Sequence, residues 1–130
     1  MENTENKTNT EVKVEAETAT NLINIEDFFK AELRVAEIID VNPIEKSNKL
    51  LKLQVSLGEK LGERQVLAGI AKHYSKEDLI GKKIIIVANL KPAKLMGEES
   101  QGMILAVDGF DNDVVLLQPA KDAPLGAQVR

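Results

Sequence analysis

Apolar and polar residues alternate along most of the chain beyond residue 30, with the period of two that is typical of β-strands. Turn-forming residues such as Asn42-Pro43 and Gly58 interrupt the pattern, so each apolar segment has a boundary. A short run at 114–117 predicts one further strand, and residues 119–130 are expected to form an extended tail. Five segments carry the main strand pattern: 31–42, 51–57, 64–69, 83–89 and 102–108.

A short helix is expected over residues 75–80, with Ser75 as its N-cap and Gly81 directly after it. Three strands, a helix and two more strands are the order of elements in an OB-fold barrel. We therefore predict an all-β protein. It is an OB-fold, a five-stranded barrel with one short helix between strands 3 and 4, plus a C-terminal strand extension. A small β-sandwich is the alternative that the pattern leaves open.

The N-terminal segment has a different character from the rest of the chain. Residues 1–22 are mostly Glu, Thr, Asn and Lys, and they contain too little apolar surface to offset the entropy of ordering them. We expect 1–22 to be a disordered acidic tail or an interdomain linker, and 23–130 to be the folded domain. A turn of helix near 26–30, capped by Asn24 or Asp27, would begin that domain.

Charge is distributed unevenly along the chain. The formal net charge is −4. Residues 46–94 nevertheless contain 11 lysines or arginines against four acids, a net of +7. A basic stretch inside an acidic protein is typical of a nucleic-acid footprint, although lysines on the solvent-facing sides of strands would give the same count.

Composition argues against catalysis and metal binding. The chain has no cysteine and a single histidine, so disulfides and thiolate zinc sites are excluded, and a nucleophile–base pair has little support. No phosphate-binding or dinucleotide-binding glycine motif occurs. We predict no catalytic residue, no metal and no cofactor. No apolar run approaches the roughly 20 residues that span a bilayer. No signal peptide is recognisable, and we predict a cytoplasmic protein with no membrane partner.

The segment 87–107, VANLKPAKLMGEESQGMILAV, holds the strongest functional signal. Two lysines, two amides and a hydroxyl lie in one loop between two predicted strands, where they suit binding of a polyanion. Aromatic residues make up only 3% of the chain, too few for a protein that stacks single-stranded DNA. The pattern favours RNA recognised through shape, phosphates and 2′-hydroxyls. The five loop residues are Asn89, Lys91, Lys94, Ser100 and Gln101.

Several motifs together carry a family resemblance that covers about 25–130. The chain resembles the C-terminal domain of bacterial methionyl-tRNA synthetase and free-standing structure-specific tRNA-binding proteins. The resemblance lies in the order and spacing of DFFKAELRVAEI (27–38), NKLLKLQVSLG (48–58), RQVLAGI (64–70), VANLKPAKLMGEESQGMILA (87–106) and LLQPAKDAPLGAQV (116–129).

The resemblance implies an OB-fold that binds tRNA by shape without reading its sequence and that supports a methionine–tRNA ligase. It implies a chain that aminoacylates nothing alone and works with a catalytic synthetase domain in cis or in trans. It also implies a homodimer with residues 108–130 at the interface. The RNA-binding candidates that it carries over are Lys49, Arg64, Asn89, Lys91, Lys94, Ser100, Gln101 and Met103.

Four of the candidates also have a structural interpretation. Asn89 could close the turn after the fourth strand, and Met103 could pack in the core. Ser100 and Gln101 could hold the loop through its backbone, whereas Lys91 and Lys94 have no evident structural task. Two other functions stay open: a chaperone-like polypeptide-binding OB-fold module, as in export-related relatives of the same barrel, and a purely structural dimerisation domain.

Overall fold

The computed structural model describes residues 21–130, and the chain divides into two units, residues 1–30 and 31–130. The described part of the first unit contains the short helix α2 (Ile25–Phe28). Asn24 is its N-cap, but its side chain makes no capping hydrogen bond. The predicted tail over 1–22 lies outside the described residues except for its last two positions.

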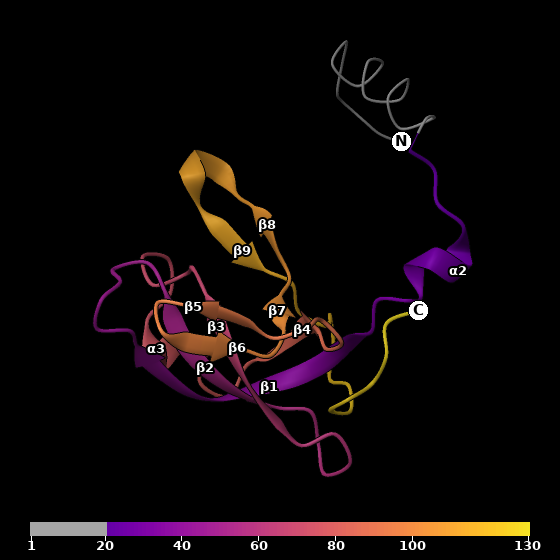
Figure 1. Ribbon diagram of the computed structural model, residues 1–130, viewed down its shortest axis with the longest axis horizontal. Coiled ribbons are helices and arrows are strands. Elements are labelled where there is room, and N and C mark those ends of the chain that lie inside the picture. The colour runs from indigo at the N-terminus through magenta and orange to yellow at the C-terminus, as the bar shows by residue number, and fades with distance from the viewer. Residues whose placement is uncertain (1–20) are drawn as a thin grey trace. The chain divides into compact units, whose positions relative to one another are not determined.

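The second unit is built on an antiparallel five-stranded sheet that curls into a nearly closed barrel (Figure 1). The strand order is β3-β2-β1-β4-β7, and the helix α3 (Lys76–Leu79) lies between β3 and β4 in the chain. This arrangement confirms the all-β, OB-like fold predicted from the alternation. The five strands are β1 (Leu33–Pro43), β2 (Leu51–Ser56), β3 (Glu63–Ala68), β4 (Lys83–Val87) and β7 (Met103–Ile104).

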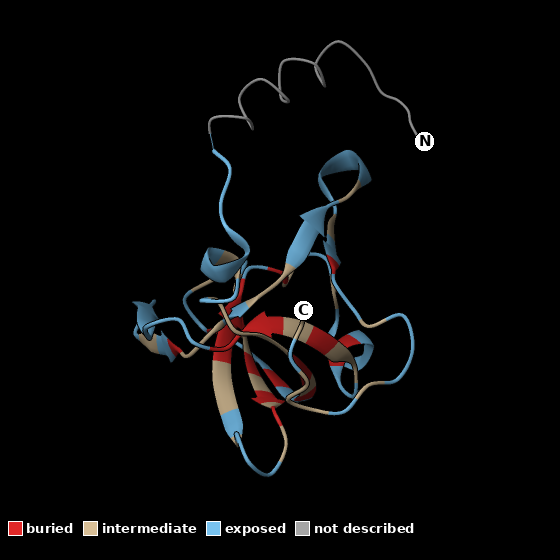
Figure 2. Ribbon diagram, turned by 90° about the vertical axis from the view of Figure 1, so that its right-hand side faces the viewer, coloured by how far each residue is buried: buried red, intermediate tan, exposed pale blue. Residues whose placement is uncertain are grey.

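The core follows directly from the period-two pattern. In β2, Leu51, Leu53 and Val55 are buried, whereas the alternating polar residues are only partly covered. Figure 2 shows the buried residues concentrated in the barrel strands. Residues from each of the four long strands and from α3 fill the interior: Ala36, Ile38, Leu53, Val55, Val66, Leu79, Ile84 and Ile86.

The helix α3 is fixed by local hydrogen bonds at its start. The Ser75 hydroxyl accepts a hydrogen bond from the Asp78 amide (3.2 Å), and the Asp78 carboxylate accepts one from the Ser75 amide (3.3 Å). The bond with Ser75 holds the pKa of Asp78 below its usual value. Leu79 then turns into the barrel and is fully buried, so the helix closes one end of the core.

The predicted strand over 102–108 is divided in two. β7 pairs with β4, whereas β8 (Ala106–Asp108) pairs with β9 (Val114–Leu116). Leu105 marks the change of partner: its amide donates to the Ile85 carbonyl (3.0 Å), and its carbonyl accepts from the Leu117 amide (3.1 Å). The apolar run is continuous, but its hydrogen-bonding partner changes, and the strand bends away from the barrel.

β8 and β9 form a projecting hairpin that ends in the 3₁₀ turn η1 (Phe110–Asn112) (Figure 1). The strand predicted near 114–117 is thereby confirmed. Two contacts tie this hairpin to the segment before α3. The Leu116 amide donates to the Tyr74 hydroxyl (3.2 Å), and His73 Nδ1 lies 3.3 Å from Asp113 Oδ1.

The C-terminal segment runs along the first half of β1. The amides of Val35, Gly126 and Val129 pair with the carbonyls of Ala127, Val35 and Leu33 at 2.8–3.0 Å. β2 pairs with β1 only from Glu37 onward, so this part of the β1 edge is available to the tail. The extended tail therefore covers a sheet edge that would otherwise be exposed.

Candidate nucleic-acid interface

The loop between β4 and β7 contains a hairpin that was predicted only as loop. β5 (Ala93–Leu95) pairs with β6 (Glu98–Ser100), and Met96 and Gly97 form the turn between them with positive φ angles of 51° and 82°. Two residues with positive φ match the twist of a tight two-residue hairpin turn. We call residues 89–101 the lysine hairpin, because Lys91 and Lys94 lie on it.

Ser100 attaches the lysine hairpin to β3. Its hydroxyl accepts a hydrogen bond from the Leu67 amide and donates to the Gly102 carbonyl, both at 3.0 Å. Among the residues that the structure describes, Ser100 is the only buried polar one, with 7% of its surface exposed. Gly102 must approach closely here, because a Cβ at that position would lie 2.9 Å from the Val87 carbonyl. Ser100 is thus in place to hold the hairpin rather than to face a ligand.

Gln101 makes a second attachment next to Ser100. Its amide donates to the Gln65 carbonyl (2.7 Å), and its side-chain oxygen accepts from the Gln65 amide (2.9 Å). The Gln65 side chain in turn donates to the Glu99 carbonyl (2.8 Å). The barrel seam between β3 and β7 is therefore closed largely by these amide side chains.

Arg64 and Asn89 hold the other end of the loop. Arg64 Nη1 donates to the Ala88 carbonyl (2.6 Å), and Asn89 Oδ1 accepts from the Glu32 amide (2.8 Å). Both side chains fix the point at which the chain leaves β4. Four of the eight predicted site residues thus anchor the lysine hairpin.

Lys91 and Lys94 differ from these anchors. Both are exposed, and neither forms a hydrogen bond or ion pair with any residue of 21–130. The hairpin that carries them lies against β2 and β3 (Figure 1), where Glu98 Oε2 is 3.6 Å from Lys52 Nζ. Two ammonium groups on an anchored hairpin are available to a polyanion.

A second basic segment lies at the loop between β1 and β2. Lys49 is exposed, and its amide donates to the Ser47 hydroxyl (3.1 Å). Its carbonyl accepts from the Ala71 amide (2.9 Å), which brings exposed Lys72 beside the same loop. We call Lys46, Lys49 and Lys72 the basic loop cluster.

The two basic segments meet at the start of β2. Lys49 lies just before β2, and Lys52, which contacts Glu98 of the lysine hairpin, is the second residue of that strand. Sequence reasoning had not included Lys52, Gln65 or Lys72 in the site. The outward position of Lys52 could be read from the alternation, whereas Gln65 and Lys72 depend on contacts across the barrel.

Met103 lies at the seam beside an apolar hollow of about 240 Å³. It is 48% exposed, so it does not pack in the core. Leu67, which is buried at 7% exposure, lies in the wall. We call this space the seam hollow. Its lining residues are Leu67, Ala68, Gly69, Ile70, Met103, Ile104, Ala106 and Val114.

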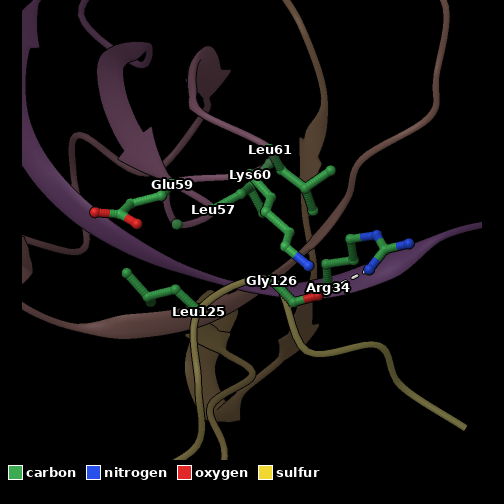
Figure 3. A pocket seen from close by; sticks show the side chains of 8 residues that line it. Arg34, Leu57, Glu59, Lys60, Leu61, Leu125 and Gly126 are labelled. Carbon is green, nitrogen blue, oxygen red and sulfur yellow. Dashed lines mark hydrogen bonds between the residues drawn. The ribbon is translucent and has the colours of Figure 1, made fainter.

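A larger hollow, of about 380 Å³, lies at the opposite end of β2, between the turn after that strand and the C-terminal segment (Figure 3). Leu57, Leu61 and Leu125 provide its apolar lining. Arg34 donates to the Gly126 carbonyl (2.8 Å), and Lys60 points toward Arg34 (Figure 3). Glu59 also lines this hollow, and Arg34 Nε lies 3.3 Å from Glu32 Oε1. The hollow therefore combines apolar walls with charges of both signs, and it contains none of the eight predicted site residues.

The carboxylates with shifted pKa values lie away from the lysine hairpin. The pKa values of Asp40 and Asp122 are lowered, by hydrogen bonds from the Val41 amide and from Lys83 respectively. No group of three His, Asp or Glu side chains in this range is placed to hold a metal ion. In the same range no helix is long and apolar enough to cross a membrane.

Comparison with known proteins gives a consistent result. The family model described as "Putative tRNA binding domain" matches residues 33–128, the whole barrel with its C-terminal segment. This chain belongs to that tRNA-binding domain family. The resemblance seen in the sequence motifs is thereby confirmed.

Curated relatives place the domain in synthetases. The chain is 56% identical over 108 residues to the methionine–tRNA ligase of Methanococcus aeolicus, covering 83% of this chain and 16% of the ligase. It is 52% identical over 121 residues to methionine–tRNA ligase 1 of Bacillus cereus, and the match covers 92% of this chain and 18% of that ligase. The chain thus spans less than a fifth of these ligases, and the stretch it matches is a tRNA-binding part, not the catalytic one.

Solved structures show the same fold in smaller proteins. A MetRS-related protein from Pyrococcus horikoshii superposes with a TM-score of 0.76 at 38% identity, covering 84% of this chain and 98% of its own. The chaperone CsaA of Bacillus anthracis gives a TM-score of 0.75 at 33% identity, and the match covers 84% of this chain and 99% of CsaA. Relatives of this tRNA-binding fold therefore include a protein that is called a chaperone.

Proposed function

We propose that this chain binds tRNA through phosphate contacts from the lysine hairpin and the basic loop cluster, reading shape rather than base sequence. The observation that carries the proposal is the exposure of Lys91 and Lys94 on a hairpin that is hydrogen-bonded to the barrel. Lysine contacts to phosphates give affinity without sequence preference. The family match and the net charge of the 46–94 segment support the same function.

The eight predicted residues divide into three groups under this proposal: phosphate contacts, residues that position the lysine hairpin, and Met103. Lys49, Lys91 and Lys94 are the phosphate contacts. Arg64 and Asn89 fix the start of the lysine hairpin. Ser100 and Gln101 act by positioning the hairpin, and Met103 lines its edge. A lysine at position 94 makes a point-charge contact, without the two-pronged grip of an arginine.

The partners follow from the relatives. We propose that the bound tRNA is presented to a methionine–tRNA ligase catalytic domain, joined to this chain or separate from it. A homodimer that uses residues 108–130 would place two tRNA-binding faces in one particle. The lack of cysteine in the chain suits the reducing cytoplasm in which aminoacylation takes place.

The salt dependence of tRNA binding tests the proposal. Replacing Lys91 and Lys94 together with Ala removes two phosphate contacts, so the slope of log Kobs against log[salt] should become shallower by about 2. Affinity for different tRNAs should fall to a similar extent. Binding titrations at several salt concentrations measure both effects.

The control is the double variant Lys60→Ala/Lys121→Ala. It removes the same charge from exposed positions that belong neither to the lysine hairpin nor to the basic loop cluster. It should leave the slope near that of the unmodified chain. If both double variants change the slope equally, net charge rather than the lysine hairpin determines binding, and the proposal fails.

A second candidate function is polypeptide binding, which the hollow of Figure 3 favours. Apolar walls from Leu57, Leu61 and Leu125 suit a leucine-like side chain, and Lys60 suits a nearby carboxylate. CsaA, a structural neighbour, is named a chaperone. A polypeptide that docks here contacts Leu61 and Lys60, which lie at the opposite end of β2 from the basic loop cluster.

A further inference from the structure

We propose that the seam hollow receives one unstacked base of the bound RNA. This inference rests on the proposed function, and it makes the preferred ligand an RNA with at least one unpaired nucleotide. Phosphate contacts alone do not distinguish such an RNA from a continuous duplex. A pocket for a single base would provide that distinction.

The position of the hollow supports this occupant, because a basic segment borders each side of it. The Leu67 amide in its wall donates to Ser100 of the lysine hairpin. Ile70, also in the wall, precedes Ala71, whose amide donates to the Lys49 carbonyl. An RNA strand held by phosphates at both segments therefore passes over the hollow.

The lining suits the face of a base. Leu67, Ile70, Ile104 and Val114 are aliphatic, and Met103 stands 48% exposed at the same hollow. A methionine thioether adapts its shape and makes favourable contacts with aromatic rings. Aliphatic walls with one thioether would thus hold a base in a protein that has few aromatic residues for stacking.

The charges around the hollow also fit an anionic strand. Two carboxylates lie close in sequence to the lining. Asp113, next to Val114, pairs with His73 (Nδ1 to Oδ1 3.3 Å), whereas Asp108 is exposed at the end of β8. Glu98 of the lysine hairpin is paired with Lys52. Glu99 lies opposite Lys94 in the β5–β6 register, but Lys49, Lys91 and Lys94 form no ion pair within residues 21–130, which favours RNA over a peptide as the occupant.

A variant that fills the hollow tests the inference. Ala106 is an exposed lining residue on β8, so Ala106→Phe should occupy the space without disturbing the core. The variant should bind tRNA more weakly, on the order of tenfold, which is the scale of losing one stacked base. Its salt slope should stay that of the unmodified chain, because no phosphate contact is lost.

Three comparisons make the result specific. Ala106→Ser, which adds no bulk, should bind tRNA like the unmodified chain, and Met103→Ala should weaken binding severalfold. A fully paired RNA duplex should bind Ala106→Phe and the unmodified chain equally. Circular dichroism and a thermal melt check that each variant is folded, and sedimentation checks that it keeps the oligomeric state of the unmodified chain, because Ala106 lies on β8.

The inference is overturned if Ala106→Phe binds tRNA as tightly as the unmodified chain does. It is equally overturned if the affinities of the variant for tRNA and for the RNA duplex fall to the same extent. It is also overturned if Ala106→Phe weakens binding of an unfolded polypeptide probe and leaves tRNA binding unchanged. These outcomes are separate from failure of the proposed function, which would appear as an unchanged salt slope in the Lys91→Ala/Lys94→Ala variant.

Discussion

The hydroxyl group of Ser100 is buried in the barrel and is not accessible to a ligand. Its two hydrogen bonds, to the Leu67 amide and the Gly102 carbonyl, lie where the lysine hairpin meets β3. Lys94 on the same hairpin is exposed. Ser100 therefore anchors the hairpin, and Lys94 is available to contact RNA. Substitution of Ser100 should change stability, whereas substitution of Lys94 should change binding.

Ser100→Ala should lower the free energy of unfolding by about 1–3 kcal/mol, because it leaves the buried Leu67 amide without its acceptor. Urea unfolding followed by circular dichroism measures the change. Lys94→Ala is the control and should alter stability by no more than about 0.5 kcal/mol, as is usual for exposed positions. Equal losses in both variants would contradict the division into anchor and contact.

Two hairpins extend from the barrel, and they differ in what holds them. The lysine hairpin has strands of three residues, too short for a two-stranded ribbon to be stable alone. It relies on Ser100 and Gln101 for attachment. The hairpin of β8 and β9 is held by the Tyr74 hydroxyl at Leu116, near its base, and by His73 at Asp113, just after the turn. Figure 2 shows that most of this hairpin is exposed.

The exposed part of the β8–β9 hairpin should form the homodimer interface. Phe110 is 94% exposed, Val107 49% and Val115 41%, which is unusual for large apolar residues on a structured hairpin. The double variant Val107→Ser/Phe110→Ser should sediment as a monomer under conditions in which the unmodified chain sediments as a dimer. Analytical ultracentrifugation decides this. A dimer that persists in the variant would place the interface elsewhere.

At the scale of the whole molecule, the barrel was predictable because its strands alternate. Leu51, Leu53 and Val55 are buried and the residues between them are not, as a period of two requires. The β5–β6 hairpin was missed because Ala93–Leu95 and Glu98–Ser100 carry no such contrast. The bend at Leu105 was missed because an apolar run does not show where its hydrogen-bonding partner changes.

The candidate site was predictable only in part for the same reason. The exposure of Lys91 and Lys94 follows from a polar loop held by Pro92 and Gly97. The anchoring contacts of Ser100 and Gln101 reach Leu67 and Gln65 on a distant strand, and Lys72 joins Lys49 only through the Ala71 amide. Contacts across a closed barrel depend on its register, which no local pattern specifies.

Hydrogen exchange of the intact chain, with and without tRNA, tests the central claim most directly. Binding by the two basic segments should slow amide exchange in peptides covering 46–52, 69–73 and 89–103. Peptides covering 58–62 and 121–126 should exchange at the same rate in both states. Protection confined to 58–62 and 121–126, or protection by an unfolded polypeptide but none by tRNA, would contradict the account.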